Sequence, residues 1–286
     1  MLIDVALLVL VVALWMTQSA VRAVRSEGLG FHPPRRSPPP PWGIEVQPAS
    51  WTVRPPRYET FEVKGWWVPP KNGATVLLTH GSVADRAQVR EELLILAGAG
   101  FGALAFDWPG HGESGGVVKL GVPERAAFEA AVDWVLKQPG VQPGHLGAFG
   151  ISNGAALVTA FAAEDPRIAA VAAAGGYTDA LDQTSHEYGG TWPWARAAAV
   201  AVVRRHLDGG NFRPIDVAAK LKGRKALFIT FADDPVVPAR MSQELADATG
   251  GEVYRIPGEG HATYAEGGGR AYAEKLVQFF SGALVR

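Results

Sequence analysis

Hydrophobic and polar positions alternate between two kinds of segment from about residue 51 onward. Near-continuous apolar runs of strand length are typical of strands buried on both faces of a sheet. They lie at residues 74–80, 102–108, 145–152, 168–176 and 225–232. Segments with apolar residues at helical spacing lie at residues 85–100, 122–138, 153–164 and 271–284. This order predicts an α/β fold with a mostly parallel central sheet and helices on both of its faces.

Three segments depart from this regular order. Residues 51–54 and 58–70 flank a Pro-Pro-Arg turn and predict an antiparallel hairpin before the first core strand, and residues 251–258 predict a short additional strand. Residues 177–214 are rich in aromatic side chains and longer than an ordinary connection between two strands. We expect this insertion to form a small helical cap.

The N-terminal segment has a different pattern. Residues 5–16 are apolar throughout, and the uncharged stretch continues to Val21, near the lower end of what spans a bilayer as a helix. A signal peptide would place Lys or Arg before the apolar run and a small-x-small cleavage site after it. Only Asp4 precedes the run, and Val21-Arg22-Ala23 is a poor cleavage site. Residues 1–24 therefore predict a membrane anchor, with an interfacial helix and a signal peptide as alternatives.

A linker rich in proline and arginine follows at residues 25–44. Its proline run favours polyproline II, which would either hold the domain at residues 45–286 away from a membrane or lie along the domain surface. The arginines after the apolar run lie on its C-terminal side. The positive-inside rule then predicts a membrane-anchored protein with its domain on the cytoplasmic side.

The composition of the chain excludes several kinds of partner and catalytic site. The formal net charge of -1 gives no electrostatic footprint for nucleic acid, so no nucleic-acid partner is expected. The absence of cysteine excludes disulfides, thiol catalysis and cysteine-based zinc sites. The seven histidines show no H-E-x-x-H or other short metal-ligand spacing, so we expect neither a metal nor a cofactor.

The strongest candidate nucleophile lies where a buried strand runs directly into a helix. The motif there is Gly150-Ile151-Ser152-Asn153-Gly154. G-x-S-x-G at a strand-to-helix turn holds a serine on a strained backbone, and the flanking glycines relieve the crowding. The helix N-terminus supplies amide donors and positive dipole to a developing oxyanion. Ser152 is therefore the predicted nucleophile.

A serine nucleophile needs a base, and the base needs an acid that orients it. Asp234 follows the strand at 225–232, and His261 follows the strand at 251–258. Both lie on loops after strands, in the chain order serine, acid, histidine that this kind of site requires. Asp233 competes for the role of acid, but the sequence Asp-Pro-Val-Val-Pro that begins at Asp234 favours Asp234.

The loop after the strand at 74–80 is the expected source of an oxyanion donor. Gly81 permits close approach of the backbone, and the amide of Ser82 would act together with the amide of Asn153. His80 precedes this pair. We interpret it as a structural histidine that braces the loop and not as a catalytic base.

In order along the chain, these motifs resemble the signatures of α/β-hydrolase-fold serine hydrolases. They are HGS at 80–82, DWPGHGES at 107–114, GISNG at 150–154, DDPVVP at 233–238 and GHATY at 260–264. The resemblance covers residues 45–286 and implies the α/β-hydrolase fold. It also implies that residues 107–114 form a turn beside the site, so that His111 and Ser114 are turn residues.

The N-terminal region and the residues ahead of the acid can also be compared with these relatives. The N-terminal apolar segment, the linker and GWWVPP at 65–70 resemble the bacterial membrane-anchored relatives of the ABHD (α/β-hydrolase domain) proteins. Many relatives have His-Gly where this chain has Thr230-Phe231 ahead of the acid. We therefore expect different packing at that position.

The predicted activity is that of a serine hydrolase. His261 takes the proton from Ser152, which attacks an acyl carbonyl, while Asp234 holds the imidazole tautomer. The expected substrates are small-molecule carboxylic esters or thioesters, with lipid-like acyl groups favoured by the apolar cap. A serine peptidase and an acyltransferase would use the same triad. A non-catalytic binding protein on this fold is the remaining alternative, although such proteins usually lack a member of the triad.

Overall fold

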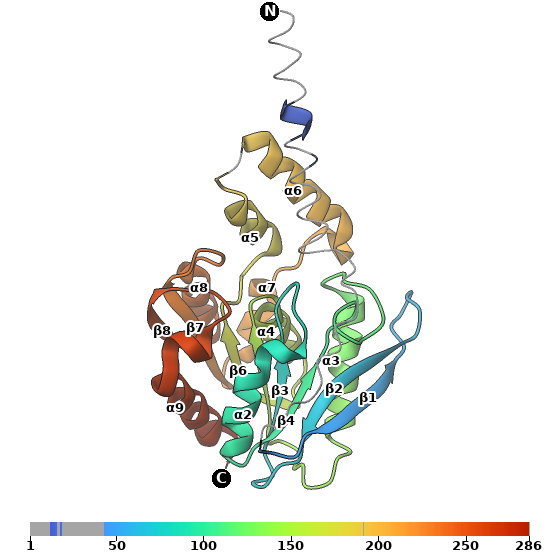
Figure 1. Ribbon diagram of the computed structural model, residues 1–286, viewed down its shortest axis with the longest axis vertical. Helices are drawn as coiled ribbons and strands as arrows, with labels where there is room; N and C mark the ends of the chain where they lie inside the picture. The colour runs from blue at the N-terminus through green and yellow to red at the C-terminus, as the bar shows by residue number, and fades with distance from the viewer. Residues whose placement is uncertain (1–11, 16–17, 19–42, 191, 286) are drawn as a thin grey trace, which may run out of the picture.

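The predicted α/β fold is confirmed. The computed structural model describes residues 12–15, 18, 43–190 and 192–285. It contains one eight-stranded sheet with the order β1-β2-β4-β3-β5-β6-β7-β8 (Figure 1). The strands are β1 (Gln47–Val53), β2 (Phe61–Val68), β3 (Thr75–Thr79), β4 (Gly102–Phe106), β5 (Leu146–Ile151), β6 (Ile168–Ala174), β7 (Lys225–Asp233) and β8 (Glu252–Glu259).

Helices connect the strands and cover the sheet. They are α2 (Arg90–Gly98), α3 (Val122–Val135), α4 (Asn153–Glu164), α5 (Ala180–Glu187), α6 (Pro193–His206), α7 (Ile215–Ala218), α8 (Ala239–Thr249) and α9 (Tyr264–Leu284). Short 3-10 turns are η2 (Arg86–Val89), η3 (Asp208–Gly210) and η4 (Ala219–Leu221).

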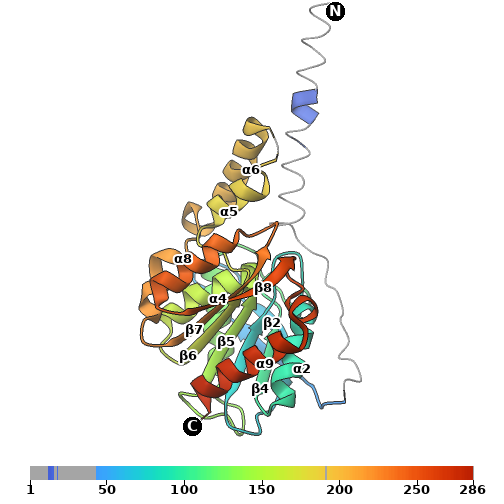
Figure 2. The ribbon, with the colours of Figure 1, turned by 90° about the vertical axis from the view of Figure 1, so that its left-hand side faces the viewer.

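The sheet has two buried faces, which explains why its central strands are continuously apolar. Leu77 of β3 belongs to the core that includes residues of α3 and α4, whereas its neighbours Val76 and Leu78 belong to the second core with α2 and α9. Helices α2 and α9 lie together on one side of the sheet in Figure 2. Alternation of side chains along a strand thus buries every position.

The predicted hairpin lies at one edge of the sheet. Strand β1 pairs with β2 antiparallel, and β2 pairs antiparallel with β4, whereas the pairs from β4 to β8 are parallel. Trp51 of β1 packs against Phe106 with ring centroids 5.7 Å apart and against Trp134 at 5.6 Å. These aromatic contacts fix the hairpin to the core beneath α3.

Helices α5 and α6 leave the sheet after β6 and rise above the rest of the domain (Figures 1 and 2). They fall within the predicted cap insertion at 177–214. The two chain segments that join them to the domain are bonded to each other: Ala180 N donates to Phe212 O at 2.9 Å, and Asn211 Nδ2 donates to both carboxylate oxygens of Asp179 at 3.1 Å. Arg213 also forms an ion pair with Asp179.

The predicted membrane anchor is wrong. A helix that crosses a bilayer needs about 20 apolar residues, and no helix within residues 12–15, 18, 43–190 and 192–285 is long and apolar enough. Residues 12–15 and 18 are the helical positions described in the segment 1–24. The rest of that segment, and the linker as far as residue 42, lie outside the described residues. The predicted membrane association is therefore not supported, and the predicted membrane-anchored cytoplasmic location is wrong.

Candidate active site

Ser152 sits on a sharp turn between β5 and α4. Its backbone has φ 53° and ψ −118°, a conformation that L side chains rarely adopt. A Cβ at Gly150 would lie 2.4 Å from the backbone of Gly154, and a Cβ at Gly154 would lie 2.4 Å from His80 O. Both glycines are therefore required for this close backbone approach, and the strained turn projects Ser152 beyond the end of the strand.

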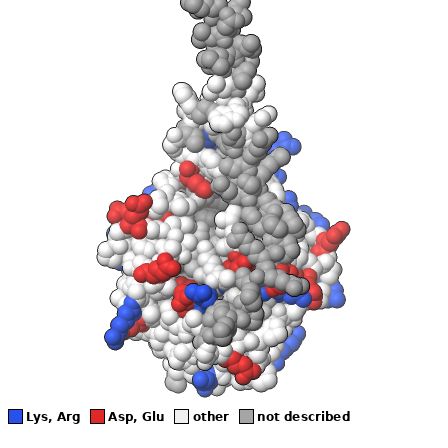
Figure 3. Space-filling model, viewed as in Figure 1, with Lys and Arg blue, Asp and Glu red and all other residues white. Residues whose placement is uncertain are grey.

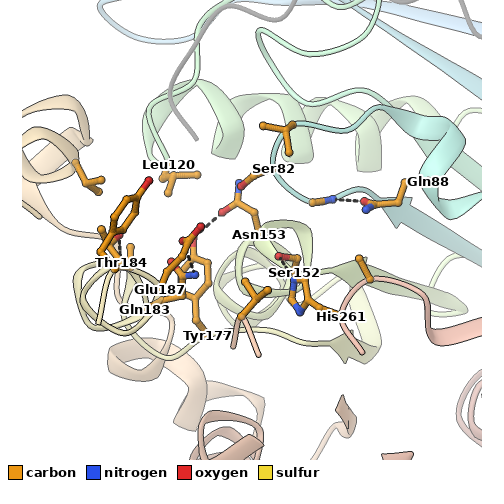
Figure 4. A pocket seen from close by; sticks show the side chains of 17 residues that line it. Ser82, Gln88, Leu120, Ser152, Asn153, Tyr177, Gln183, Thr184, Glu187 and His261 are labelled. Atoms are coloured by element: carbon orange, nitrogen blue, oxygen red, sulfur yellow. Dashed lines mark hydrogen bonds between the residues drawn. The ribbon is translucent and has the colours of Figure 1, made fainter. Parts of the chain in front are cut away.

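The structure brings Ser152, His261 and Asp234 together from three separate strand ends. Ser152 Oγ lies 2.9 Å from His261 Nε2 (Figure 4), and His261 Nδ1 lies 2.9 Å from Asp234 Oδ2. Because a carboxylate only accepts, Nδ1 carries the proton and Nε2 accepts from the serine hydroxyl. This tautomer is the one in which the histidine can act as a base toward Ser152.

Asp234, and not Asp233, faces the histidine. The Asp234 side chain is fully buried, and its Oδ1 accepts from the amides of Val236 and Val237 at 2.9 Å each. Asp233 ends β7 and is exposed. The apolar pair after Asp234 thus turns the backbone so that two amides hold its carboxylate in place.

Phe231 is accommodated by glycines around His261. A Cβ at Gly260 or Gly267 would lie 2.8 Å or 2.5 Å from the Phe231 ring, so only glycine leaves room for it. The ring also stacks on Tyr264 with centroids 5.1 Å apart. Burial, followed by the charge of Asp234, raises the pKa of Tyr264 well above its usual value. The Tyr264 hydroxyl therefore keeps its proton and lies 3.4 Å from Asp234 Oδ2.

The loop after β3 lies directly against Ser152. Ser82 and Asn153 both line the same cavity as Ser152. The amide of Gly81 is already used, because it donates to Gln88 Oε1 at 2.7 Å. Asn153 is the first residue of α4, where a helix leaves its amide without a partner inside the helix. This arrangement leaves the amides of Ser82 and Asn153 as the candidate oxyanion donors. The bond between Gln88 and the amide of Gly81 was not predicted from the sequence.

His80 braces this loop, as expected. Its Nε2 accepts from the amide of Trp108 at 3.0 Å, so its Nδ1 carries the proton and donates to Gly81 O at 2.7 Å. The side chain is completely buried. Both ring nitrogens are engaged with backbone, and neither is directed at Ser152.

The segment at 107–114 forms a turn next to the loop. The Asp107 carboxylate accepts from the amides of Arg86 at 2.8 Å and Glu113 at 2.9 Å, and it also pairs with the Arg86 guanidinium. Burial raises the pKa of Asp107 to about 6 against the opposing effect of Arg86. His111 Nδ1 lies 3.1 Å from Pro109 O, and Ser114 Oγ donates to Asp107 O at 2.9 Å. His111 and Ser114 thus bond within the turn.

A cavity of about 340 Å³ lies between Ser152 and the helices α5 and α6. Figure 4 shows side chains from both sides of it. Tyr177, a buried residue that lines the cavity, donates to Asn153 Oδ1 at 2.6 Å. The aliphatic and aromatic side chains that line the cavity are Val83, Leu120, Tyr177, Ala180, Tyr188, Val203, Val236 and Ala262. Within the described part of the chain, no group of three or more His, Asp or Glu side chains is arranged to hold a metal ion.

The sequence of this chain matches a known protein family. Residues 39–236 match the model of the X-Pro dipeptidyl-peptidase (S15) family. Among curated proteins, an uncharacterized protein of Mycobacterium tuberculosis, found in strains CDC 1551 / Oshkosh and H37Rv, is 28% identical over 250 residues. The match covers 85% of this chain and 83% of that protein.

Solved structures show the same fold at low identity. The Pyrococcus furiosus esterase Pf2001 superimposes with a TM-score of 0.72 at 18% identity, covering 90% of this chain and 98% of that one. The α/β hydrolase GrgF from Penicillium sp. sh18 gives a TM-score of 0.67 at 15% identity, covering 84% and 99%. The fold is therefore that of the α/β-hydrolases. These comparisons do not bear on the resemblance to ABHD proteins.

Proposed function

This chain belongs to the X-Pro dipeptidyl-peptidase (S15) family, and from that membership we propose that it is a serine hydrolase that forms an acyl-enzyme on Ser152. One observation carries the proposal: the continuous hydrogen-bonded line from Ser152 Oγ through His261 to the buried carboxylate of Asp234. A structural serine has no need of a histidine held in one tautomer by a third group.

The first half of the reaction acylates the enzyme. Ser152 Oγ attacks the carbonyl carbon of the substrate while its proton passes to His261 Nε2. The tetrahedral intermediate then collapses, the bond to the leaving group breaks, and His261 returns the proton to the leaving atom. Asp234 stabilises the imidazolium that exists between these two proton transfers and keeps the ring in position.

Deacylation repeats the same steps with water. His261 takes a proton from the water, the hydroxide oxygen attacks the acyl carbonyl, and Ser152 leaves with the proton returned by His261. In both halves the negative oxygen would be held by the amides of Ser82 and Asn153. Each such donor typically contributes about 3 to 4 kcal/mol to the transition state.

Carboxylic esters and thioesters with a small, largely apolar acyl group suit the cavity best. Its volume of about 340 Å³ is near the lower end for small-molecule sites. Leu120 and Val203 offer hydrocarbon surface within it. A lipid-like acyl chain is the variant of this substrate class that the apolar lining supports, with the chain length limited by the cavity.

A peptidase is the second candidate, and a specific side chain favours it. Glu187 lines the cavity from α5 and accepts from Gln183 Nε2 at 3.0 Å. A carboxylate at this position would attract the ammonium group of a peptide N-terminus. The family name also refers to dipeptidyl-peptidases. On this alternative, Glu187→Gln would abolish peptide cleavage and leave the cleavage of neutral esters unaffected.

The full chain, treated with a fluorophosphonate probe, tests the proposal. Wild type, Ser152→Ala and the matched control Ser281→Ala on α9 would be labelled side by side. They would then be assayed on p-nitrophenyl esters of increasing length and on Ala-Pro p-nitroanilide. We expect labelling and ester turnover in wild type and the control, and neither in Ser152→Ala. A folded wild type that neither labels nor turns over any of these substrates contradicts the proposal.

A further inference from the structure

The segment that would bind the oxyanion is held by a side chain that takes no part in the triad. We propose that Gln88 is a positioning residue for the oxyanion hole, setting the direction of the Ser82 amide by holding the peptide that precedes it. This inference rests on the proposed function. Gln88 belongs to η2, six residues beyond Ser82, and it is half-buried on the wall of the cavity.

Two planar peptides decide where the Ser82 amide points. Gln88 Oε1 accepts from Gly81 N at 2.7 Å and so holds the peptide between His80 and Gly81. His80 Nδ1 donates to Gly81 O at 2.7 Å and holds the peptide between Gly81 and Ser82. Because each peptide is a rigid plane, fixing both leaves no freedom at Gly81. Glycine, the residue with the widest choice of backbone angles, is thereby restricted to one conformation.

The loop cannot shift without affecting the nucleophile. A Cβ at Gly81 would lie 3.0 Å from Ser152 Cβ and 3.3 Å from Ile151 O, so the loop backbone lies directly against the nucleophile turn. A donor contributes to an oxyanion hole only when it lies about 2.7 to 3.1 Å from the oxygen that develops charge. Ser82 N belongs to the next peptide along the chain, so we expect rotation of the 80–81 peptide to shift it relative to that oxygen.

Gln88 itself is anchored at its own end. Asp85 caps η2 by accepting from Ala87 N at 2.8 Å, and Gln88 N donates to Asp85 O at 3.0 Å. The neighbouring Arg86 is paired with Asp107. His80 bonds to the next residue in that turn, Trp108. Both contacts on Gly81 thus have their supports in the same turn at 107–114, which gives that motif a function beside the site.

The alternative is that Gln88 contacts the substrate directly. Kinetics separate the two roles, because a substrate contact changes KM, whereas a donor that acts on the oxyanion changes kcat. Gln88→Met removes the acceptor and keeps the length of the side chain. We expect kcat on a p-nitrophenyl ester to fall about tenfold with KM unchanged, since the donor would be displaced and not lost.

A transition-state analogue provides the second readout. A trifluoromethyl ketone forms an anionic hemiketal on Ser152, and its inhibition constant should weaken by the same factor of about ten in Gln88→Met. The matched control is Gln138→Met, since Gln138 also bonds to a backbone group, Trp134 O at 2.9 Å, but far from the cavity. This control should retain wild-type kcat, KM and inhibition.

Several outcomes would overturn the inference. Unchanged kcat in a labelled, folded Gln88→Met, or a raised KM with unchanged kcat, removes the positioning role while leaving the proposed function intact. If wild type shows neither labelling nor turnover, both the proposed function and this inference are wrong. If Gln88→Met does not fold, Gln88→Asn makes the same test, because it is polar but too short to reach Gly81 N.

Discussion

The strand ends that carry the candidate triad and the α5–α6 cap are built in opposite ways. Ser152 and Asp234 lie at the C-terminal ends of buried strands, and each is held by backbone hydrogen bonds or by steric restriction. In the cap, Trp192 and Trp194 before and within α6 are 58% and 36% exposed. Charged side chains of both signs are interspersed on the face of the molecule shown in Figure 3.

Because of this difference, we expect proton transfer and the selection of substrate to depend on different regions of the molecule. Proton transfer requires atoms within hydrogen-bond distance, so its residues need a rigid support. A cap needs only to present a surface, and it contributes Thr184, Tyr188 and Val203 to the cavity without bonding to the triad. Substitutions in the two regions should therefore have different effects, in magnitude and in the parameter that changes.

The largest effect is expected at the acid. Asp234→Asn preserves the shape but disturbs the tautomer of His261, and kcat should fall about ten-thousand-fold. Steady-state kinetics on p-nitrophenyl acetate measures this loss. The matched control is Asp233→Asn, which changes the exposed neighbour and should leave kcat at the wild-type value. If the control loses as much activity as Asp234→Asn, the assignment of the acid is wrong.

A buried carboxyl in the sheet domain gives the next largest effect, on stability. Burial raises the pKa of Glu92 to about 7, and Tyr272 Oη donates to it at 2.8 Å. The stability that depends on its protonation is present below about pH 4.5 and lost as the pH rises through 7. Glu92→Gln keeps the hydrogen bond without the charge, so it should raise the free energy of unfolding at pH 8 by about 2 to 3 kcal/mol.

Urea denaturation at pH 5 and pH 8 checks this prediction. Wild type should be less stable at pH 8, and Glu92→Gln should remove most of that difference. The adjacent Glu91→Gln is the control, because the Glu91 side chain is about half exposed at 45% and its surface ion pair with Arg90 contributes little. Equal pH dependence in wild type and Glu92→Gln would contradict the prediction.

The cap should alter selectivity without altering the chemistry. Val203 of α6 lines the cavity, and Val203→Phe fills part of it. We expect kcat/KM for a p-nitrophenyl octanoate to fall about tenfold while the acetate is hydrolysed normally. Ala201→Phe places the same ring on the exposed side of α6 and should change neither. Equal losses on both esters would mean that the cap affects the triad.

The smallest effect is expected where the cap joins the domain. Asn211→Ala removes the bonds to Asp179 and the bond that Phe212 N donates to Asn211 Oδ1, and it should cost about 1 kcal/mol of stability. Trypsin should then cleave faster after Arg204 and Arg205 in α6. Asn72→Ala loses a comparable bond, to Ala74 N at 3.0 Å, at a turn before β3, and should not change cleavage in the cap. Unchanged cleavage in Asn211→Ala would show that other contacts hold the cap.

Much of this molecule could be predicted from local pattern. Buried strands and amphipathic helices have periods that can be read directly from residue types, and the G-x-S-x-G turn marks Ser152 because only glycine permits its backbone. Ser152, Asp234 and His261 could be chosen because each lies at the end of a predicted strand and because they occur in the required chain order. The same approach failed at residues 1–24, where an apolar composition was interpreted as a membrane anchor that the described residues do not support.

The sequence by itself determined the alternation of strands and helices and the residue types of the candidate triad, because both depend on neighbours within a few positions. Only the tertiary structure decided between Asp233 and Asp234, explained Phe231 by the glycines around His261, and brought Gln88 to the amide of Gly81. These outcomes depend on distances between segments that are far apart in the chain. Such distances are set by the packing of the whole sheet, and no local pattern encodes them.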